Sequence, residues 1–464
     1  MKEEKFDYIV IGAGFSGLSC ALRLAMFDHK VAIFESHSIP GGLNSYYKRR
    51  VNDELIRIDT GLHALTNFSL KGEIGTKLLP QILKQFRFSY DQLDLCPQKK
   101  SKIIIKDNEL IFTNDINFLI SQISELYPKD LDGFIKFLDF VKSEDLKKYN
   151  QPFESGNAII SRFLKDEELI KLLSFPVISY GSCWENDIDS YLYLSLFKAI
   201  YLEGLARPKD GIKTLIDLFE KKINTLSNSK IFYRSQVDNI LAFDDVVHVK
   251  SGSNLYEVQK VFSSIGYPGT KQLIGEPYDK SGLSNVSFVE VVFVYATEKT
   301  GDYDETIIFF NESDTSIFSE KNVLTSKKAG VICCVENFES ETQLNKIIKV
   351  TYYGNYSSWE SLSREEYNQE KNMTIEHAKN ILNKYLPLEQ RTPSFIDCFT
   401  PKTIKKYTRH LNGAVYGSTQ KFKNGIFSNS NNLILIGADQ GNVGITGCIL
   451  SGASMANKHG LSLG

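Results

Sequence analysis

The chain has 464 residues, of which 42% are hydrophobic and 24% are charged, which predicts a large globular protein with two or three lobes. The formal net charge of −2, without any concentrated basic stripe, argues against a nucleic-acid partner. The seven cysteines have no CxxC spacing, which indicates a reducing compartment, and the seven histidines form no ligand cluster, so we expect no metal site.

The first elements in chain order form a nucleotide-binding βαβ unit, from residue 7 to residue 35. The spacing predicts a tight turn at Gly12, a close backbone approach to a pyrophosphate at Gly14, and close packing of helix on sheet at Gly17. The helix N-terminus then faces the phosphates, where its free amides and dipole favour negative charge. Glu35 ends the second strand and is expected to accept hydrogen bonds from the adenosine ribose, and its charge argues against NADP.

A glycine pair, Gly41 and Gly42, follows this unit, and a charged hairpin-like stretch then leads to IDTGLHALTNF. The C-terminal residues 433–460 read as a buried strand, a glycine turn, an acid at Asp439 and a small-residue helix that begins near Ile445. A second helix N-terminus can point at a flavin ring, while Asp439 binds the ribitol or pyrophosphate region. Since NAD has no use for this arrangement, the sequence predicts FAD as the cofactor.

Two long insertions separate the nucleotide-binding segments. The first begins as a hairpin, with Asp107 and Asn108 at its turn, and continues as amphipathic helix. Its apolar stretches 158–181 and 188–204 are expected to be core helices, with a tunnel wall or a lipid contact as the alternative. The second insertion alternates strand patterns with turns and ends in the helical segment 373–387, which predicts a mixed sheet that carries helices.

The predicted fold class is α/β, with a discontinuous Rossmann-like FAD-binding domain and a mixed sheet-plus-helix substrate domain. We expect the FAD-binding domain to combine residues 1–68, 206–275 and 395–464, and the substrate domain to combine residues 69–205 and 276–394. The first strand begins close to the N-terminus, so we expect no targeting segment and a cytoplasmic protein. No apolar run reaches the roughly 18 residues of a spanning helix, which leaves a peripheral membrane contact open.

These blocks resemble FAD enzymes of the phytoene desaturase, carotenoid isomerase and retinol saturase group, within the flavin amine oxidase superfamily. The resemblance extends to residues 207–219, 233–249 and 399–418 and covers somewhat under half of the chain. It implies that Val237 holds the adenine through its backbone amide. The pair Leu43–Asn44 stands where the group often has an arginine, so the branch within the group stays open.

The residues named for catalysis are His63 and Tyr416. His63 could lie near the flavin ring as a proton donor or orienting group, with a hydrogen-bonded structural histidine as the alternative. Tyr416 could face the substrate or simply pack, and Asp59 could anchor its turn or touch the cofactor. The residues expected to bind the cofactor belong to the βαβ unit, the glycine-pair loop, the adenine strand and the C-terminal turn: Gly12, Gly14, Phe15, Ser16, Gly17, Glu35, Ser36, Gly41, Gly42, Leu43, Asn44, Val237, Gly437, Asp439, Gly444, Ile445 and Thr446.

The resemblance implies a flavoenzyme that desaturates, isomerises or saturates a long apolar polyene or isoprenoid, with the redox step carried by the flavin. A flavin amine or amino-acid oxidase and a non-catalytic isoprenoid-binding protein on the same scaffold are the alternatives. The insertions contain no second GxGxxG unit. Electrons are therefore expected to come from the substrate, from oxygen or from an external partner that the sequence does not identify.

Overall fold

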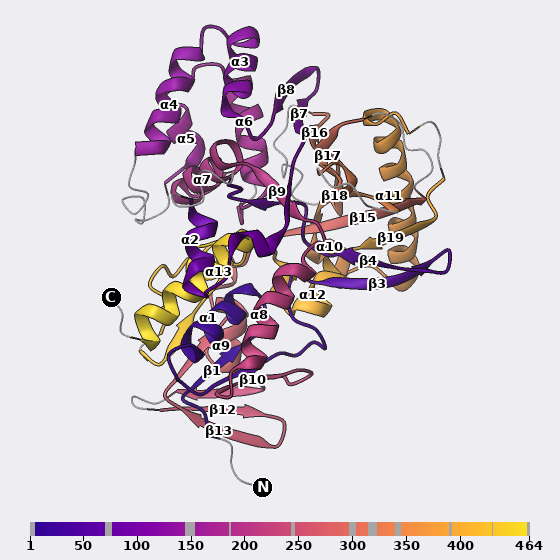
Figure 1. Ribbon diagram of the computed structural model, residues 1–464. Coiled ribbons are helices and arrows are strands. Elements are labelled where there is room, and N and C mark those ends of the chain that lie inside the picture. The colour runs from indigo at the N-terminus through magenta and orange to yellow at the C-terminus, as the bar shows by residue number, and fades with distance from the viewer. Residues whose placement is uncertain are drawn as a thin grey trace.

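The computed structural model describes residues 5–69, 77–143, 154–184, 187–242, 246–296, 303–313, 323–338, 345–388, 392–428 and 430–461. Figure 1 shows three parts: a lower part, a helical lobe at the upper left, and a second sheet with helices at the right. The lower part carries indigo, magenta and yellow ribbon together, because it draws on the beginning, the middle and the end of the chain.

The lower part is built on a parallel sheet of five strands. These strands are β1 (Tyr8–Ile11), β2 (Val31–Phe34), β10 (Ser229–Phe232), β14 (Lys260–Ser263) and β20 (Leu433–Leu435). Their order in the sheet is β10-β2-β1-β14-β20, and every neighbouring pair is parallel. The carboxyl ends of β1 and β14 therefore meet at one edge of the sheet, which is where such folds bind nucleotides.

Both faces of this sheet are covered. One face packs through Val10 and Ile33 against α1 (Phe15–Ala25), α8 (Lys213–Thr225) and α13 (Gly444–Met455). The other face packs through Ile9 and Ile11 against an antiparallel meander, because successive strand side chains point to opposite faces. The meander consists of β11 (Asn239–Ala242), β12 (Val247–Ser251) and β13 (Asn254–Val258).

A second, seven-stranded sheet confirms the expected mixed sheet. Its strands, in spatial order, are β19 (Phe395–Phe399), β15 (Val286–Ala296), β18 (Asn345–Asn355), β17 (Thr325–Cys334), β16 (Glu305–Asn311), β7 (Lys100–Ile105) and β8 (Asn108–Phe112). The strands β16 and β7 are parallel and the other pairs are antiparallel. Helix α11 (Arg364–Tyr385) covers one face and the helical lobe covers the other. Cys333 and Cys334 accordingly point to opposite cores and are free thiols.

The helical lobe contains both apolar stretches of the first insertion as buried core helices, as expected. The hairpin of this insertion is also confirmed, although its turn lies at Lys106 and Asp107, because Asn108 already pairs with Ile105 in the ladder. Lys106 has a φ of 53°, as two-residue hairpin turns require. The helices are α3 (Ile116–Leu126), α4 (Leu131–Ser143), α5 (Gly156–Ile160), α6 (Glu167–Ser179), α7 (Ser190–Phe197) and the π-helix η4 (Lys198–Glu203).

Further short elements complete the three parts. They are the hairpin β3 (Tyr46–Val51) and β4 (Glu54–Asp59), the small sheet of β5 (Leu65–Thr66), β9 (Leu205–Pro208) and β6 (Leu95–Pro97), and the helices α2 (Leu78–Gln85), α9 (Tyr267–Leu273), α10 (Tyr356–Glu360) and α12 (Pro401–Thr408). Among the residues that the structure describes, no helix has both the length and the apolar character needed to cross a membrane.

Candidate cofactor and substrate site

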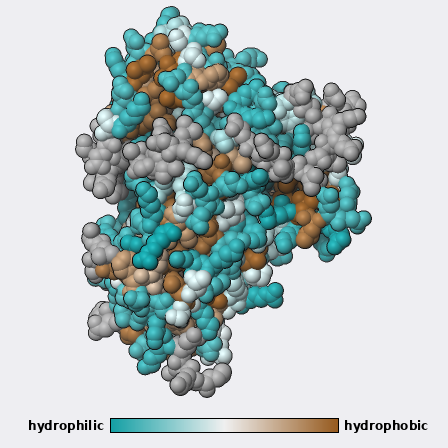
Figure 2. Space-filling view, viewed as in Figure 1, coloured by the Kyte–Doolittle hydropathy of each residue, from teal (hydrophilic) through white to brown (hydrophobic). Residues whose placement is uncertain are grey.

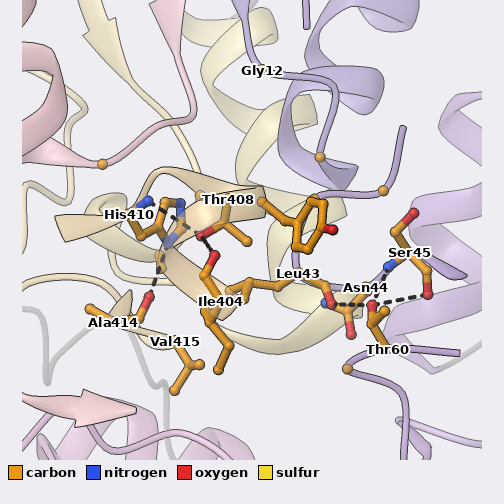
Figure 3. A pocket seen from close by; sticks show the side chains of 18 of the residues that line it. Gly12, Leu43, Asn44, Ser45, Thr60, Ile404, Thr408, His410, Ala414 and Val415 are labelled. Carbon is orange, nitrogen blue, oxygen red and sulfur yellow. Dashed lines mark hydrogen bonds between the residues drawn. The ribbon is translucent and has the colours of Figure 1, made fainter. Parts of the chain in front are cut away.

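One cavity of about 930 Å³ lies between the two sheets. It begins at the carboxyl ends of β1 and β2 and continues to the face of β15 and β18, where Phe288 and Tyr353 line it. Figure 3 shows two sides of it: Leu43, Asn44 and Ser45 lie beside Thr60 on one side, and the segment from Thr408 to Val415 lies on the other. Its volume lies at the upper end of the range typical of small-molecule sites.

The first glycine motif opens into this cavity as the spacing predicts. Gly12 has a φ of 93°, which permits the tight turn after β1. A side chain at Gly17 would collide with the carbonyl oxygen of Gly12, so this position holds α1 close to the strand. At Gly14, by contrast, a Cβ would meet no atom within 4 Å. The backbone edge of Gly14 is therefore exposed to the cavity at the start of α1.

The C-terminal helix α13 also exposes the backbone of a glycine at its N-terminus. Helix α13 begins at Gly444, whose φ is 73° and whose Cβ would meet no atom within 4 Å. A side chain at Gly452 would collide with the carbonyl oxygen of Ser16, so α13 packs directly on α1. The N-termini of two packed helices, α1 and α13, thus open into one cavity.

The chemistry of this cradle fits a dinucleotide with two negatively charged phosphates and an electron-accepting ring. The free backbone amides at the N-termini of α1 and α13 favour negative charge at two points of the same cavity. A ligand can approach these amides closely because Gly14 and Gly444 have no side chains. The carboxylate of Glu35 and the buried Val237 line the same cavity beyond the first helix. The residues present therefore fit FAD.

Glu35 is already engaged in the structure. Its Oε2 accepts a hydrogen bond from the amide of Ala13 at 2.7 Å, and its Oε1 accepts one from the amide of His37 at 2.7 Å. A carboxylate has about four lone-pair positions, so capacity for a ribose remains. The ribose contact stays a prediction. The hydrogen bonds from the amides of Ala13 and His37 show that Glu35 also shapes the turn after β1.

The glycine-pair loop lies against the first motif. The amide of Gly41 donates to the carbonyl of Ala13 at 2.8 Å, and Gly41 also forms a bridge with Gly14. The φ values of 111° at Gly41 and 59° at Gly42 belong to the left-handed region that favours glycine. The loop then brings Leu43 and Asn44 to the cavity wall.

Asp439 lines the cavity, but its side chain joins three segments of protein. Its Oδ2 accepts from the amide of Tyr267 and its Oδ1 from the amide of Ser418, both at 2.6 Å, and the Lys421 ammonium lies 3.8 Å from Oδ1. Asp439 is 1% exposed. These contacts make it a clamp between the strands' carboxyl edge and the loop before β20, and the expected ribitol contact stays a prediction.

The structure brings most of the predicted cofactor residues to the cavity wall. Two of the predicted residues are not among its lining. Gly17 is one, because it faces the strand, and Thr446 is the other, because its buried hydroxyl lies 3.4 Å from the carbonyl of Thr66. Those that line the cavity are Gly12, Gly14, Phe15, Ser16, Glu35, Ser36, Gly41, Gly42, Leu43, Asn44, Val237, Gly437, Asp439, Gly444 and Ile445.

His63 lines the cavity and belongs to a buried polar cluster that the sequence does not reveal. Its Nε2 lies 3.1 Å from Oε2 of Glu290 and 3.0 Å from Oγ1 of Thr351. The Nζ of Lys349 donates to Oε1 of Glu290 at 3.0 Å and to the carbonyl of Asp59 at 2.7 Å. The available signal is a charge in the middle of each of two apolar strands, Glu290 in β15 and Lys349 in β18.

The charge states of this cluster follow from its contacts. Burial would raise the pKa of Glu290, but the Lys349 ammonium and the His63 hydrogen bond outweigh it and lower that pKa to about 2. Burial lowers the pKa of His63 below its ordinary value of 6.5, against the opposing pull of Glu290. At neutral pH the cluster therefore contains an ionised carboxylate and a neutral imidazole.

Asp59 anchors its turn. Its Oδ2 accepts from Arg207 at 2.6 Å and from the amide of Ile212 at 3.0 Å, and the pair is buried. Arg207 also donates to the carbonyls of Leu62, at 2.7 Å, and His63, at 3.0 Å. This ion pair holds the backbone on which His63 stands, so Arg207, to which the sequence assigns no role, is a positioning residue.

Tyr416 lies in an aromatic wall of the cavity. Its ring packs edge-on against Phe288, which packs in turn against Tyr353. The hydroxyl of Tyr416 donates to the carbonyl of Ser179 at 2.7 Å, and that of Tyr353 donates to Oγ of Ser179 at 2.8 Å. The hydroxyls are thus turned to the protein, and burial raises the pKa of Tyr416 well above its ordinary value. A ligand at this aromatic wall would therefore meet neutral rings and no ionised phenol.

No group of three or more His, Cys, Asp or Glu side chains that could hold a metal ion occurs within the described part of the chain.

Comparison with known proteins supports this description. The family model for an NAD(P)-binding Rossmann-like domain matches residues 10–74. A prolycopene isomerase from Daucus carota is 20% identical over 459 residues, which cover 90% of this chain and 72% of the relative. A lycopene-forming phytoene desaturase from Pseudescherichia vulneris is 24% identical over 61% of this chain and 62% of its own length. An all-trans-retinol 13,14-reductase from Macaca fascicularis is 26% identical over 38% of this chain and 25% of its own.

Solved structures show the same fold over almost the whole chain. An oxidoreductase from Methanosarcina mazei matches with a TM-score of 0.64 and 17% identity, over 96% of this chain and 99% of its own. A putrescine oxidase solved with putrescine matches with a TM-score of 0.61 and 14% identity, over 98% and 99%. The fold is that of FAD-dependent oxidoreductases, and the homologues include carotenoid desaturases and isomerases and retinol reductases.

Proposed function

We propose that this chain, a homologue of the prolycopene isomerases and phytoene desaturases, is an FAD-dependent oxidoreductase that acts on a long apolar polyene or isoprenoid by desaturation, isomerisation or saturation. The observation that carries the proposal is the shape and lining of one cavity. Two helix N-termini open into it at Gly14 and Gly444, and it continues without a break to the aromatic wall of Phe288, Tyr353 and Tyr416.

A bound flavin would supply the two-electron chemistry, and the protein would supply position and surroundings. The amides at the start of α13, near Ile445 and Gly447, would stabilise negative charge on the reduced ring. The rings of Phe288, Tyr353 and Tyr416 would hold an apolar chain and exclude water. The backbone near Gly14 and the carboxylate of Glu35 would hold the pyrophosphate and the adenosine.

A contact with a membrane surface fits this proposal, because a lipid bilayer is where a long apolar substrate dissolves. Figure 2 shows apolar surface at the top of the molecule, over the lobe of α3 and α4. In these two helices Phe118, Leu126 and Ile135 are 37%, 49% and 39% exposed. Replacing all three with serine should reduce co-sedimentation with phospholipid vesicles, and equal binding of the triple variant would remove these helices from the proposal.

The test of the cofactor and of the substrate class uses the purified full chain. The protein should be yellow, should release FAD on denaturation, and should carry an apolar lipid that mass spectrometry identifies as an isoprenoid. Under anaerobic conditions that lipid, or its reduced or oxidised counterpart, should bleach or restore the flavin absorbance. Colourless protein that takes up no FAD, yet binds an isoprenoid, would reassign the chain as a binding protein.

The solved amine oxidases share the fold at low identity, so amine oxidation is the alternative outcome of the same experiment. Putrescine or cyclohexylamine should neither bleach the flavin nor release hydrogen peroxide. The cluster near His63 carries a carboxylate, Glu290, but Lys349 neutralises it at 3.0 Å. An uncompensated anion that would attract a substrate cation is therefore not present at this cluster.

A further inference from the structure

We propose that His63 is the proton-transferring residue of this site and that Glu290 is the positioning residue that fixes its tautomer, with Nδ1 of His63 as the atom that takes or returns the substrate proton. This inference rests on the proposed function and names a residue-level step within it. The geometry of the buried cluster carries it, since His63, Glu290 and Thr351 all line the cavity.

The contacts of Nε2 determine which nitrogen of His63 carries the proton. Nε2 lies 3.1 Å from Oε2 of Glu290, and the hydroxyl of Thr351 donates to the same oxygen at 3.0 Å. An unprotonated Nε2 would point its lone pair at an ionised carboxylate, which is repulsive. Nε2 therefore carries the hydrogen and donates it toward Glu290, so that in the neutral imidazole Nδ1 is the bare nitrogen.

Hydrogen-bond donors at both carboxylate oxygens keep Glu290 ionised. Lys349 is 1% exposed and its ammonium donates to Oε1 of Glu290 and to the carbonyls of Asp59 and Thr60. Because both carboxylate oxygens accept hydrogen bonds from these donors, Glu290 stays ionised and His63 keeps the proton on Nε2. The carboxylate thus orients the imidazole and stabilises its protonated form once a proton arrives, without itself becoming the base.

The position of His63 relative to α13 determines what its Nδ1 can reach. His63 stands two residues before β5, and the hydroxyl of Thr446 in α13 lies 3.4 Å from the carbonyl of Thr66 in β5. Strand β5 therefore lies against the first turn of α13, and His63 lines the same cavity as Gly444 and Ile445, where the ring is proposed to bind. Its side chain is 11% exposed, and its Nδ1 has no hydrogen-bond partner among the described residues.

The groups that face His63 come from four strands and from the residue that follows α6, and together with burial they explain its neutral state. Glu290 of β15 favours the charged form, whereas burial, Lys349 of β18 and Arg207 of β9 oppose it. The ring of Tyr180, next to α6, lies 6.0 Å away, and the thiol of Cys333 in β17 donates to the carbonyl of His63 at 3.8 Å. A neutral base near an apolar wall is suited to taking a proton at physiological pH.

In a desaturation, one substrate C–H bond would break and its hydrogen would leave as hydride. A bound oxidised flavin would supply the acceptor for this two-electron oxidation. The neighbouring C–H bond breaks and its proton goes to Nδ1 of His63, and the electron pair left behind forms the new double bond. A saturation runs the same steps backwards from reduced flavin, with the protonated His63 as the acid.

The test combines a spectroscopic measurement with turnover. Histidine-selective ¹⁵N NMR of the purified wild-type protein should show His63, assigned by its loss in His63→Gln, as a neutral ring with hydrogen on Nε2 at pH 7. In the flavin-loaded protein, His63→Gln keeps an amide donor for Glu290 and should retain flavin and substrate affinity, but its kcat should fall by about 10²–10⁴-fold. His377→Gln, on the outer helix α11, is the matched control and should leave kcat unchanged.

Two results would overturn the inference while leaving the proposed function intact. One is a hydrogen on Nδ1 of His63 at pH 7, and the other is a flavin-loaded His63→Gln enzyme whose kcat falls by less than about tenfold. If His63→Gln does not fold, single variants of the other six histidines assign the His63 signals by elimination, and Glu290→Gln replaces His63→Gln. The inference then requires a change in the NMR signals of His63 together with a lower kcat. Failure of the proposed function would look different, because the wild-type protein would then either hold no flavin or oxidise amines and leave the isoprenoid unchanged.

Discussion

Gly452 of α13 lies directly against the carbonyl oxygen of Ser16 in α1, so closely that a side chain at Gly452 would collide with that oxygen. This contact holds the N-termini of both helices at one cavity. The residues are separated by most of the chain, and the proposed cofactor site depends on their approach.

Gly452→Val should therefore push α13 away from α1. We expect a loss of about 3 kcal/mol in the free energy of unfolding, because backbone cannot yield as a flexible side chain would, and weaker flavin binding. Chemical denaturation and flavin titration measure the two effects. Gly282→Ala is the control, since its Cβ would meet Thr419 at 3.8 Å and should change neither. Full stability of Gly452→Val would contradict the close packing.

Gly14→Val should remove flavin binding without changing the stability of the fold. The φ of −69° and ψ of 173° at Gly14 suit any residue, and the new Cβ would enter open space in the cavity. The flavin-free protein should melt at the wild-type temperature, yet flavin should no longer bind, because the side chain occupies the pyrophosphate position. A yellow Gly14→Val protein at full occupancy would place the pyrophosphate elsewhere.

Glu35→Ala tests the adenosine end of the site. FAD should bind more weakly by about 1.5–3 kcal/mol, the range for hydrogen bonds to charged groups. FMN, which has no adenosine, supplies the internal control, and its affinity should not change. Isothermal titration of both flavins distinguishes a lost ribose contact from a distorted turn, since the Ala13 and His37 amides also lose their acceptor. Equal weakening of both flavins would assign the loss to the turn.

Glu336 should make the protein less stable as the pH rises. Burial raises the pKa of this carboxyl from 4.5 to about 7, against the hydrogen bond from Tyr303, and its Oε2 is buried without a partner among the described groups. Below the unfolded pKa both states hold the proton and no cost arises. As the pH climbs from about 4.5 to about 7, the unfolded state releases its proton while the folded state still holds it. Above about 7 the folded state carries a disfavoured charge, and the free energy of unfolding is lower by up to about 3 kcal/mol at pH 8.

Glu336→Gln should remove this dependence. The variant should be more stable than wild type at pH 8 and similar to it at pH 4.5, as measured by urea denaturation at both values. A stability difference between the two proteins that does not vary with pH would show that the carboxyl titrates normally.

The parts of this protein that the sequence predicted are those that depend on a few neighbouring residues. The turn at Gly12, the open backbone at Gly14 and the close packing at Gly17 need particular backbone angles or a missing side chain, and such needs are visible in a short spacing. The mixed sheet and the core helices of the insertions were likewise predictable, because strand and helix periodicity is local.

Other properties were decided by tertiary structure alone. Glu290 and His63 are 227 positions apart, and their 3.1 Å contact exists because β15 of the second sheet lies against the turn that Arg207 and Asp59 hold. The same holds for Asp439, whose oxygens bind amides of distant segments and whose role as a clamp is not visible in its own neighbourhood. The free energy of such contacts depends on which surfaces the whole chain buries together, so only the folded molecule determines which side chains meet.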